Sequence, residues 1–171
     1  MTDYSKMEMR AVYAQTLDDL ICENPNVMSL EADLGKASGT FPLIPDKHPD
    51  NFIDVGVAEA NMIGVACGMA SQGLIPFVYS ITPFLIDRAY EFIKIDVDFD
   101  KANVKLVGAG RRGEYKEDGF THFAYKSAKL IGTFDNIKEY WPTSEKEVKH
   151  AVKDSLKDGP VFISLSRYGV K

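Results

Sequence analysis

Short apolar segments with strand character alternate along this chain with segments whose apolar residues recur at helical spacing. This alternation constrains the fold more than any other feature. The expected strands are residues 27–31, 52–55, 75–79, 104–107 and 161–166. The expected helices cover about residues 9–21, 59–73, 83–96 and 144–157. Residues 35–50 and 108–121 are rich in glycine and charged residues, and we expect loops there.

Strands that alternate with helices in this way predict an α/β domain with a mostly parallel sheet and helices on both faces. In such sheets, ligands bind beyond the carboxyl ends of the strands. Asp33, the turn 55–59, Thr82 and the loop 108–121 all follow expected strands. We therefore expect a functional site at the edge of the sheet where these segments meet.

The composition limits the kind of partner and compartment. The chain has 171 residues, which suits one domain, and its formal net charge of −5 argues against nucleic acid as a partner. The apolar runs are too short for a membrane span, and residues 1–10 do not resemble a signal peptide. Cys22 and Cys67 are expected to be buried thiols in a reducing compartment. These features predict a cytoplasmic protein.

Two other groups of polar residues are expected to lie on the surface. His48 stands among charged residues and prolines at 46–50, which is typical of a surface position and not of a ligand. The charged residues of the helix expected at 144–157 are typical of a solvated helix face.

Glu59 is the residue whose position is hardest to explain from packing alone. It stands at the start of a helix rich in glycine and alanine, which can pack closely against another backbone. A buried, unpaired carboxylate is costly and tends to keep its proton. A carboxylate at a helix N-terminus is also commonly stabilised by the helix dipole. The spacing of the residues does not choose between these two interpretations.

Four short segments together resemble the pyrimidine-binding domain of transketolase, and the resemblance covers nearly the whole chain. These segments are GVAEAN at 56–61, the strand and aromatic at 76–84, EDGFTH at 117–122 and ADL at 32–34. Each motif alone is weak, but four motifs in register form a specific pattern. The resemblance implies the thiamine-diphosphate-binding fold for residues 1–171 as a single domain.

The resemblance implies roles toward thiamine diphosphate. Glu59 is expected to hydrogen-bond N1′ of the aminopyrimidine and to favour its imino form, which makes it the catalytic residue. Phe84 is expected to pack on the pyrimidine ring, and Ile81 stands where the family has a second aromatic. Asp33 and Leu34 match a loop that touches the thiazolium side.

The resemblance also implies a sugar phosphate as substrate. Arg10 and Arg167 match positions that hold the substrate phosphate, which a guanidinium suits. Asp118 and His122 are expected to contact the hydroxyls and carbonyl of the sugar. A family histidine is absent after the fourth strand, at residues 107–112, where Arg111 or Arg112 is a candidate substitute.

Several family features are missing from the chain, and their absence predicts a partner. No Gly-Asp-Gly followed some 25–30 residues later by Asn is present, so Mg²⁺ and the diphosphate are expected to be held by a diphosphate-binding transketolase subunit. Neither a diphosphate-binding domain nor the C-terminal transketolase domain is expected in residues 1–171. The small residues after Glu59 suggest close packing and self-association into a dimer of heterodimers. Whether the chain is naturally this short or a fragment stays open.

Three functions remain in competition. The first is the pyrimidine-binding subunit of a split transketolase that transfers a two-carbon ketol unit between sugar phosphates. The second is a subunit of a pyruvate-using enzyme like deoxyxylulose-phosphate synthase, which Ala58-Glu59 resembles, whereas Leu165-Ser166-Arg167 favours transketolase. The third is a non-catalytic assembly module, against which the joint presence of Glu59, Phe84, Asp118 and His122 argues.

Overall fold

The computed structural model describes residues 8–38, 40–157 and 159–167, and within them six parallel strands form one sheet. The strand order is β2-β1-β3-β4-β6-β5. The strands are β1 (Val27–Glu31), β2 (Phe52–Asp54), β3 (Ile75–Ile81), β4 (Lys105–Ala109), β5 (Lys138–Tyr140) and β6 (Val161–Leu165). The predicted α/β class is confirmed, and every strand pair is parallel.

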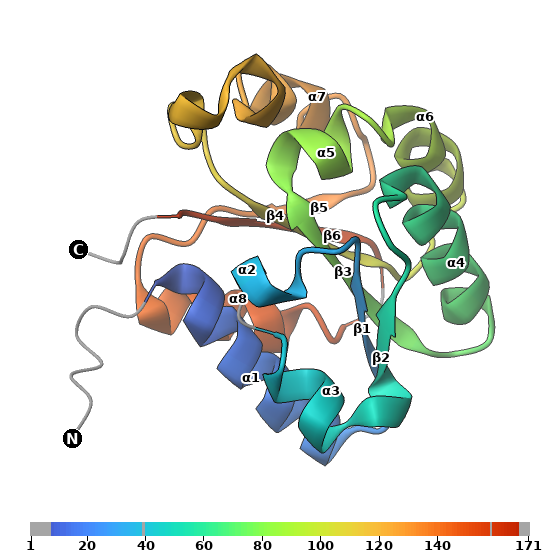
Figure 1. Ribbon diagram of the computed structural model, residues 1–171. Coiled ribbons are helices and arrows are strands. Elements are labelled where there is room, and N and C mark those ends of the chain that lie inside the picture. Colours follow the sequence, from blue (N-terminus) through green and yellow to red (C-terminus); the bar gives the residue numbers. More distant parts are fainter. Residues whose placement is uncertain (1–7, 39, 158, 168–171) are drawn as a thin grey trace.

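Helices cover both faces of the sheet, as predicted (Figure 1). One face carries α1 (Met9–Glu23), α2 (Gly35–Ser38), α3 (Leu43–Lys47) and α8 (Glu145–Asp154). The other face carries α4 (Glu59–Ser71), α5 (Thr82–Ile86), α6 (Tyr90–Phe92), a π-helical segment (Ile93–Phe99) and α7 (Ser127–Ile131). Single 3₁₀ turns lie at Pro49–Asn51, Lys116–Asp118 and Phe120–His122.

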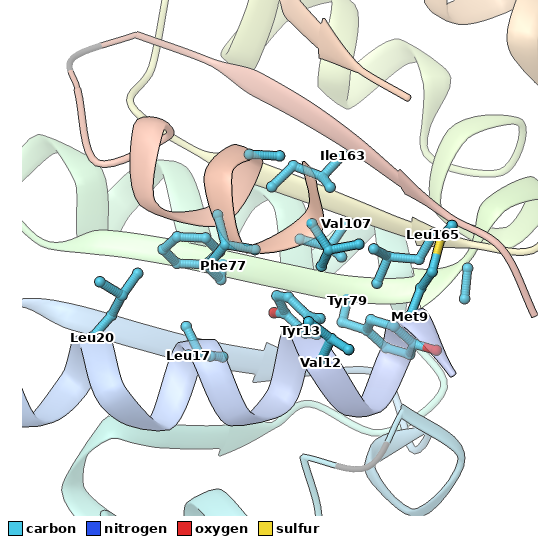
Figure 2. Packing of buried hydrophobic residues seen from close by; sticks show 14 of the residues in the cluster. Met9, Val12, Tyr13, Leu17, Leu20, Phe77, Tyr79, Val107, Ile163 and Leu165 are labelled. Atoms are coloured by element: carbon cyan, nitrogen blue, oxygen red, sulfur yellow. The ribbon is translucent and has the colours of Figure 1, made fainter. Parts of the chain in front are cut away.

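Alternation along the strands divides the core into two layers. Successive side chains of a strand point to opposite faces, so Phe77 and Tyr79 pack under α1 while Val78 packs under α4 and α5. Figure 2 shows the first layer, in which the ring of Tyr13 stacks on that of Tyr79 with their centroids 6.0 Å apart. The sheet is thereby buried on both faces.

The prediction of a loop over residues 35–50 was wrong, because α2, α3 and a 3₁₀ turn lie there. Glycine, proline and charge dominate that stretch, yet Ile44 is fully buried against α1, and Leu34 and Leu43 pack beside it. Tertiary packing therefore outweighs local composition in this segment.

The single helix expected at 83–96 is also wrong, because it is divided into α5, α6 and the π-helical segment. Its core-facing residues are Leu85, Ala89, Ile93 and Val97, which repeat strictly every four residues. In a regular α-helix four residues advance about 40° beyond a full turn, so such a stripe would rotate out of the core. The wider π-type turns correct this drift, and one of them closes with a 3.3 Å bond from the Arg88 amide to the Pro83 carbonyl.

Two expectations about surface and buried residues need correction. Cys22 is exposed and Cys67 half-buried, because the core stripe of α1 passes through Leu20 and Ile21 and leaves Cys22 outside it. The His48 side chain is only 16% exposed and pairs with Asp18 on α1. The charged face of α8 is solvated as predicted.

No helix in the described part of the chain combines the length and the apolar character that crossing a membrane requires.

Candidate functional site

Glu59 is buried at the first residue of α4, with only 1% of its side chain exposed. Its Oε2 lies 2.7 Å from Nη1 of Arg88, and within the described residues Oε1 accepts no hydrogen bond. The ion pair and the positive end of the helix together offset the cost of burying the carboxylate. One carboxylate oxygen therefore remains available to a bound molecule.

The turn that presents Glu59 is fixed by a neighbouring carboxylate. Oδ1 of Asp54 accepts the Gly56 amide at 2.9 Å and the Asp33 amide, also at 2.9 Å. Gly56 has φ +71°, a conformation that side chains disfavour, which explains a glycine at this point. The two turns that follow β1 and β2 are thus held together by one atom.

A cavity of about 530 Å³ lies between α5 and the segment 120–126. Its lining residues are Pro83, Phe84, Asp87, Arg88, Phe120, Thr121, Phe123, Tyr125 and Lys126. The guanidinium carbon of Arg88 lies 4.3 Å from the centroid of the Phe84 ring, and His122 meets that ring edge-on at 4.8 Å. Arg88 therefore links Glu59 to Phe84, and the Phe84 ring in turn contacts His122, so three of the predicted site residues form one chain of contacts.

Arg10 and Arg167, the predicted phosphate ligands, meet on one aromatic side chain. Nη1 of Arg10 donates to the Tyr115 hydroxyl at 3.4 Å, and the Arg167 guanidinium lies 4.5 Å from the Tyr115 ring centroid. Asp118 Oδ2 lies 3.7 Å from Nη1 of Arg167. Burial raises the pKa of Tyr115 although both arginines act to lower it, so its hydroxyl stays neutral. Two guanidinium groups thus share one neutral tyrosine.

The Tyr115 ring fits at this position because a glycine, without a side chain, stands against it. Gly110 has φ +88°, and a Cβ there would collide with the Tyr115 ring. Buried Glu114 accepts the Arg167 amide at 2.7 Å and the Ser166 hydroxyl at 2.6 Å. These contacts fasten the loop after β4 to the end of β6.

Three predicted cofactor residues lie at the same edge of the sheet but outside the cavity. Asp33 lines a shallow hollow of about 140 Å³ with Asp54 and Phe41. Leu34 packs against the α1 side of the core, and Ile81 is buried at the end of β3. The structure therefore does not join them to Phe84.

Arg111 does not line the cavity either. Its Nη2 donates to the Pro142 carbonyl at 2.6 Å and to the Ser164 carbonyl at 2.8 Å, and burial lowers its pKa. Arg112, the other candidate for the missing histidine, lies 5.7 Å from the ring of Tyr125 in the cavity wall.

Sequence reasoning missed four residues of this site: Asp54, Arg88, Glu114 and Tyr115. Arg88 follows Phe84 by four residues, a spacing that places both side chains on one side of a helix and could have revealed it. Nothing in the sequence singled out Tyr115, because its contacts come from residues about 50 and 105 positions away along the chain.

Comparison with known families identifies the family to which this domain belongs. The family profile described as "Transketolase, pyrimidine binding domain" matches residues 5–171. The chain belongs to the transketolase pyrimidine-binding domain family. The six-stranded parallel sheet described above is thus the fold of a transketolase pyrimidine-binding domain.

Three similar proteins illustrate the relationship. The chain is 34% identical over 160 residues to the 6-deoxy-6-sulfo-D-fructose transketolase subunit SqwH of Clostridium sp. (strain MSTE9), covering 93% of the chain and 49% of that protein. It is 31% identical over 158 residues to a 1-deoxy-D-xylulose-5-phosphate synthase of Thermomicrobium roseum, covering 91% of the chain and 25% of that protein. Among solved structures, "Split gene transketolase, inactive beta4 tetramer" matches with a TM-score of 0.85 and 31% identity, covering 96% of the chain and 53% of its own. The transketolase pyrimidine-binding domain described here therefore spans about half of two of these proteins and a quarter of the third.

Proposed function

We propose that this chain is the pyrimidine-binding part of a split, thiamine-diphosphate-dependent transketolase that moves a two-carbon ketol unit between sugar phosphates. The observation that carries the proposal is the buried Glu59 carboxylate, with one oxygen available, beside the Phe84 ring in a domain of this family. When bound, thiamine diphosphate supplies the electron sink on which the carbon–carbon bond of a ketose is broken and made.

The Glu59 carboxylate and the Phe84 ring of the cavity fit the aminopyrimidine of that cofactor. Oε1 of Glu59 is available to hold a proton at N1′, and the Phe84 ring offers an apolar face to the pyrimidine. Arg88 covers this ring and holds the other Glu59 oxygen. Arg88, whose side chain is 46% exposed, would therefore move outward to admit the ring. Asp33, Leu34 and Ile81 would contribute from the adjoining edge of the sheet.

The substrate phosphate is assigned to the two arginines that share Tyr115. Arg10 and Arg167 approach that ring from different elements, and their paired positive charges suit the oxygens of a phosphate. Asp118 and His122 lie next to Arg167 and Phe84 respectively, where they would bind the hydroxyls and carbonyl of a sugar. Arg111 is left out of this assignment because the Ser164 and Pro142 carbonyls hold its guanidinium.

A partner chain would supply the diphosphate site and its Mg²⁺. The surface of α4 that faces away from the core is a stripe of Asn61, Gly64, Gly68 and Ser71, and a Cβ on either glycine would meet nothing within 4 Å. Beside it Ile95 is 49% exposed and Phe99 79% exposed. Small residues next to exposed apolar side chains suit close packing of another subunit, which supports a dimer of heterodimers.

The experiment is reconstitution with a transketolase subunit that carries the Gly-Asp-Gly and downstream Asn motif. Alone, the chain should bind thiamine diphosphate weakly by calorimetry and show no ketol transfer. With the partner and Mg²⁺, it should bind the cofactor tightly and transfer a two-carbon unit from a ketose phosphate. Tight, Mg²⁺-dependent binding of the cofactor by the chain alone would contradict the split arrangement.

A second candidate keeps the cofactor and changes the donor. The similarity to 1-deoxy-D-xylulose-5-phosphate synthase favours pyruvate, which that class of enzyme decarboxylates. Assaying the reconstituted complex with pyruvate and with ketose phosphates separates the two, because only the pyruvate reaction releases carbon dioxide.

A further inference from the structure

A second group of polar side chains lies at the opposite edge of the sheet from the cavity. Asp18 and Cys22 stand one turn apart on α1, and His48 ends α3, which packs beside that helix. In Figure 1 these two helices lie together at the end of the molecule away from α5 and α7. The proposed transketolase function uses none of the three residues.

The three side chains converge on one ring nitrogen. Nε2 of His48 lies 2.9 Å from Oδ1 of Asp18 and 3.8 Å from Sγ of Cys22, and the three donor atoms all lie within 4.8 Å of one another. A nucleophilic Cys-His-Asp relay needs the acid and the nucleophile on different nitrogens of the imidazole. Here both side chains lie next to the same nitrogen, Nε2, which excludes that relay. Side chains that bind one shared cation converge in this way.

The donor set suits zinc. Thiolate, imidazole and carboxylate are the three ligand types that Zn²⁺ takes, at about 2.0–2.3 Å. In a tetrahedral site with those bond lengths, neighbouring ligand atoms lie about 3.3–3.6 Å apart. The observed 2.9 and 3.8 Å separations from His48 need shifts of a few tenths of an ångström, and the Asp18 and Cys22 atoms, which lie within 4.8 Å of each other, need to approach by about 1 Å at most. Cys22 is exposed, so its side chain is free to make that shift.

Neighbouring residues orient the carboxylate without using the oxygen that faces the histidine. Oδ2 of Asp18 accepts Nε2 of Gln15 at 3.1 Å and Nζ of Lys47 at 2.5 Å. These contacts hold the carboxylate in place, as contacts to the outer atoms of metal ligands commonly do.

We propose that Asp18, Cys22 and His48 bind one Zn²⁺ ion, with solvent at the fourth position. The ion fastens the C-terminal half of α1 to the α3 segment. The site lies at the amino ends of the strands, away from Glu59 and the cavity.

The test is a titration of the full chain with Co²⁺ followed by absorption, and then with Zn²⁺ as competitor. Binding should produce a thiolate-to-cobalt charge-transfer band that Zn²⁺ abolishes. Cys22→Ser should remove the band, and His48→Ala and Asp18→Asn should each weaken Zn²⁺ binding at least tenfold. Zn²⁺ should raise the Tm of the wild type and leave that of Cys22→Ser unchanged.

The chain offers matched controls for two of the ligands. Cys67→Ser and His150→Ala should leave the band and the Zn²⁺ affinity unchanged, because burial raises the pKa of Cys67 to about 12 and keeps it a thiol, and His150 lies exposed on α8. A wild-type spectrum with no thiolate band overturns the proposal. Equal loss of Zn²⁺ affinity in the control and ligand variants overturns it as well.

Discussion

The two faces of the sheet differ in how completely the helices that cover them bury their apolar residues. On the α1 face, large apolar side chains such as Leu17 and Tyr13 are fully buried (Figure 2), and the exposed residues of α8 are polar or charged. On the α4 face, glycines of α4 and apolar residues of the π-helical segment remain at the surface, and the ion pair of Glu59 lies at its edge. The difference indicates that the buried layer under α1 mainly provides stability, whereas the α4 face provides the surface for assembly and the Glu59 carboxylate. The predictions below test this division, from the largest expected effect to the smallest.

Glu59→Gln in the reconstituted complex should lower turnover about 10²–10⁴-fold, because an amide cannot share a proton with the cofactor. The fold should be preserved, since the side chains are nearly isosteric and the change removes a buried charge. Exchange of the cofactor's C2 proton, measured by quench and NMR, isolates this step. Glu91→Gln on the surface of α6 is the matched control, and exchange at the wild-type rate in Glu59→Gln would reduce Glu59 to a helix-end residue.

Leu17→Ala on the α1 face should cost about 2–5 kcal/mol in the free energy of unfolding, because it leaves a cavity in a fully buried layer. Urea unfolding of the isolated chain measures this loss. The kcat of reconstituted complex that remains folded should be unchanged. A large fall in kcat at normal stability would break the division between the faces.

Arg10→Ala and Arg167→Ala should each weaken transition-state binding of phosphorylated sugars by about 1.5–3 kcal/mol, the value of a charge-assisted contact. The loss should appear as a raised KM for phosphorylated donors and leave donors without phosphate nearly unaffected. Lys153→Ala on α8 serves as the control. Equal losses on both kinds of donor would instead give the arginines a structural role around Tyr115.

Gly68→Leu should separate folding from assembly. In the isolated chain the change should stabilise α4 by up to about 1 kcal/mol, because glycine is a poor helix former and the site is open. Association with the partner subunit should weaken at least tenfold, measured by analytical ultracentrifugation or calorimetry. Unchanged association would place the partner on another surface.

Asp87→Asn should change stability in a pH-dependent way. Burial raises the pKa of Asp87 in the folded chain, so the stability that the wild type has below the unfolded pKa is lost as pH rises through the folded value. The asparagine variant should therefore be slightly more stable than wild type at pH 7, and this gain should vanish near pH 3. Urea unfolding at both pH values, with Asp19→Asn as control, measures it. The 2.7 Å bond from Ser127 can persist, because an amide oxygen also accepts.

The sequence predicted those features that local periodicity determines. The bounds of β1, the start of α4 at Glu59 and the parallel sheet with helices on both faces all follow from short-range pattern. The broken helix after Pro83 could have been suspected, because its apolar residues repeat every four positions and not at the helical period. The burial of Ile44 had no local signal, since its environment is created by α1.

The sequence predicted several residues of the candidate site, but it did not predict the contacts that join them. Glu59, Phe84 and His122 were identified through motifs; Phe84 lines the cavity, His122 meets its ring edge-on, and Glu59 is linked to it through Arg88. Arg88 and Tyr115, which connect the predicted residues, were missed because side-chain pairs across the fold leave no local pattern. Arg111 was chosen for its position after β4, but position alone does not reveal that backbone carbonyls hold its guanidinium.

The single oxygen of Asp54 that accepts both the Asp33 and the Gly56 amides has a consequence for evolution. Neither turn can gain or lose a residue without breaking the bond that holds the other, so both turns must keep their length together. The segment between Gly110 and Lys126 is tied to β6 at one end and is otherwise exposed to solvent along much of its length. Descendants of this protein that take new substrates would therefore change in that segment, while the turns on either side of Asp54 stay the same length.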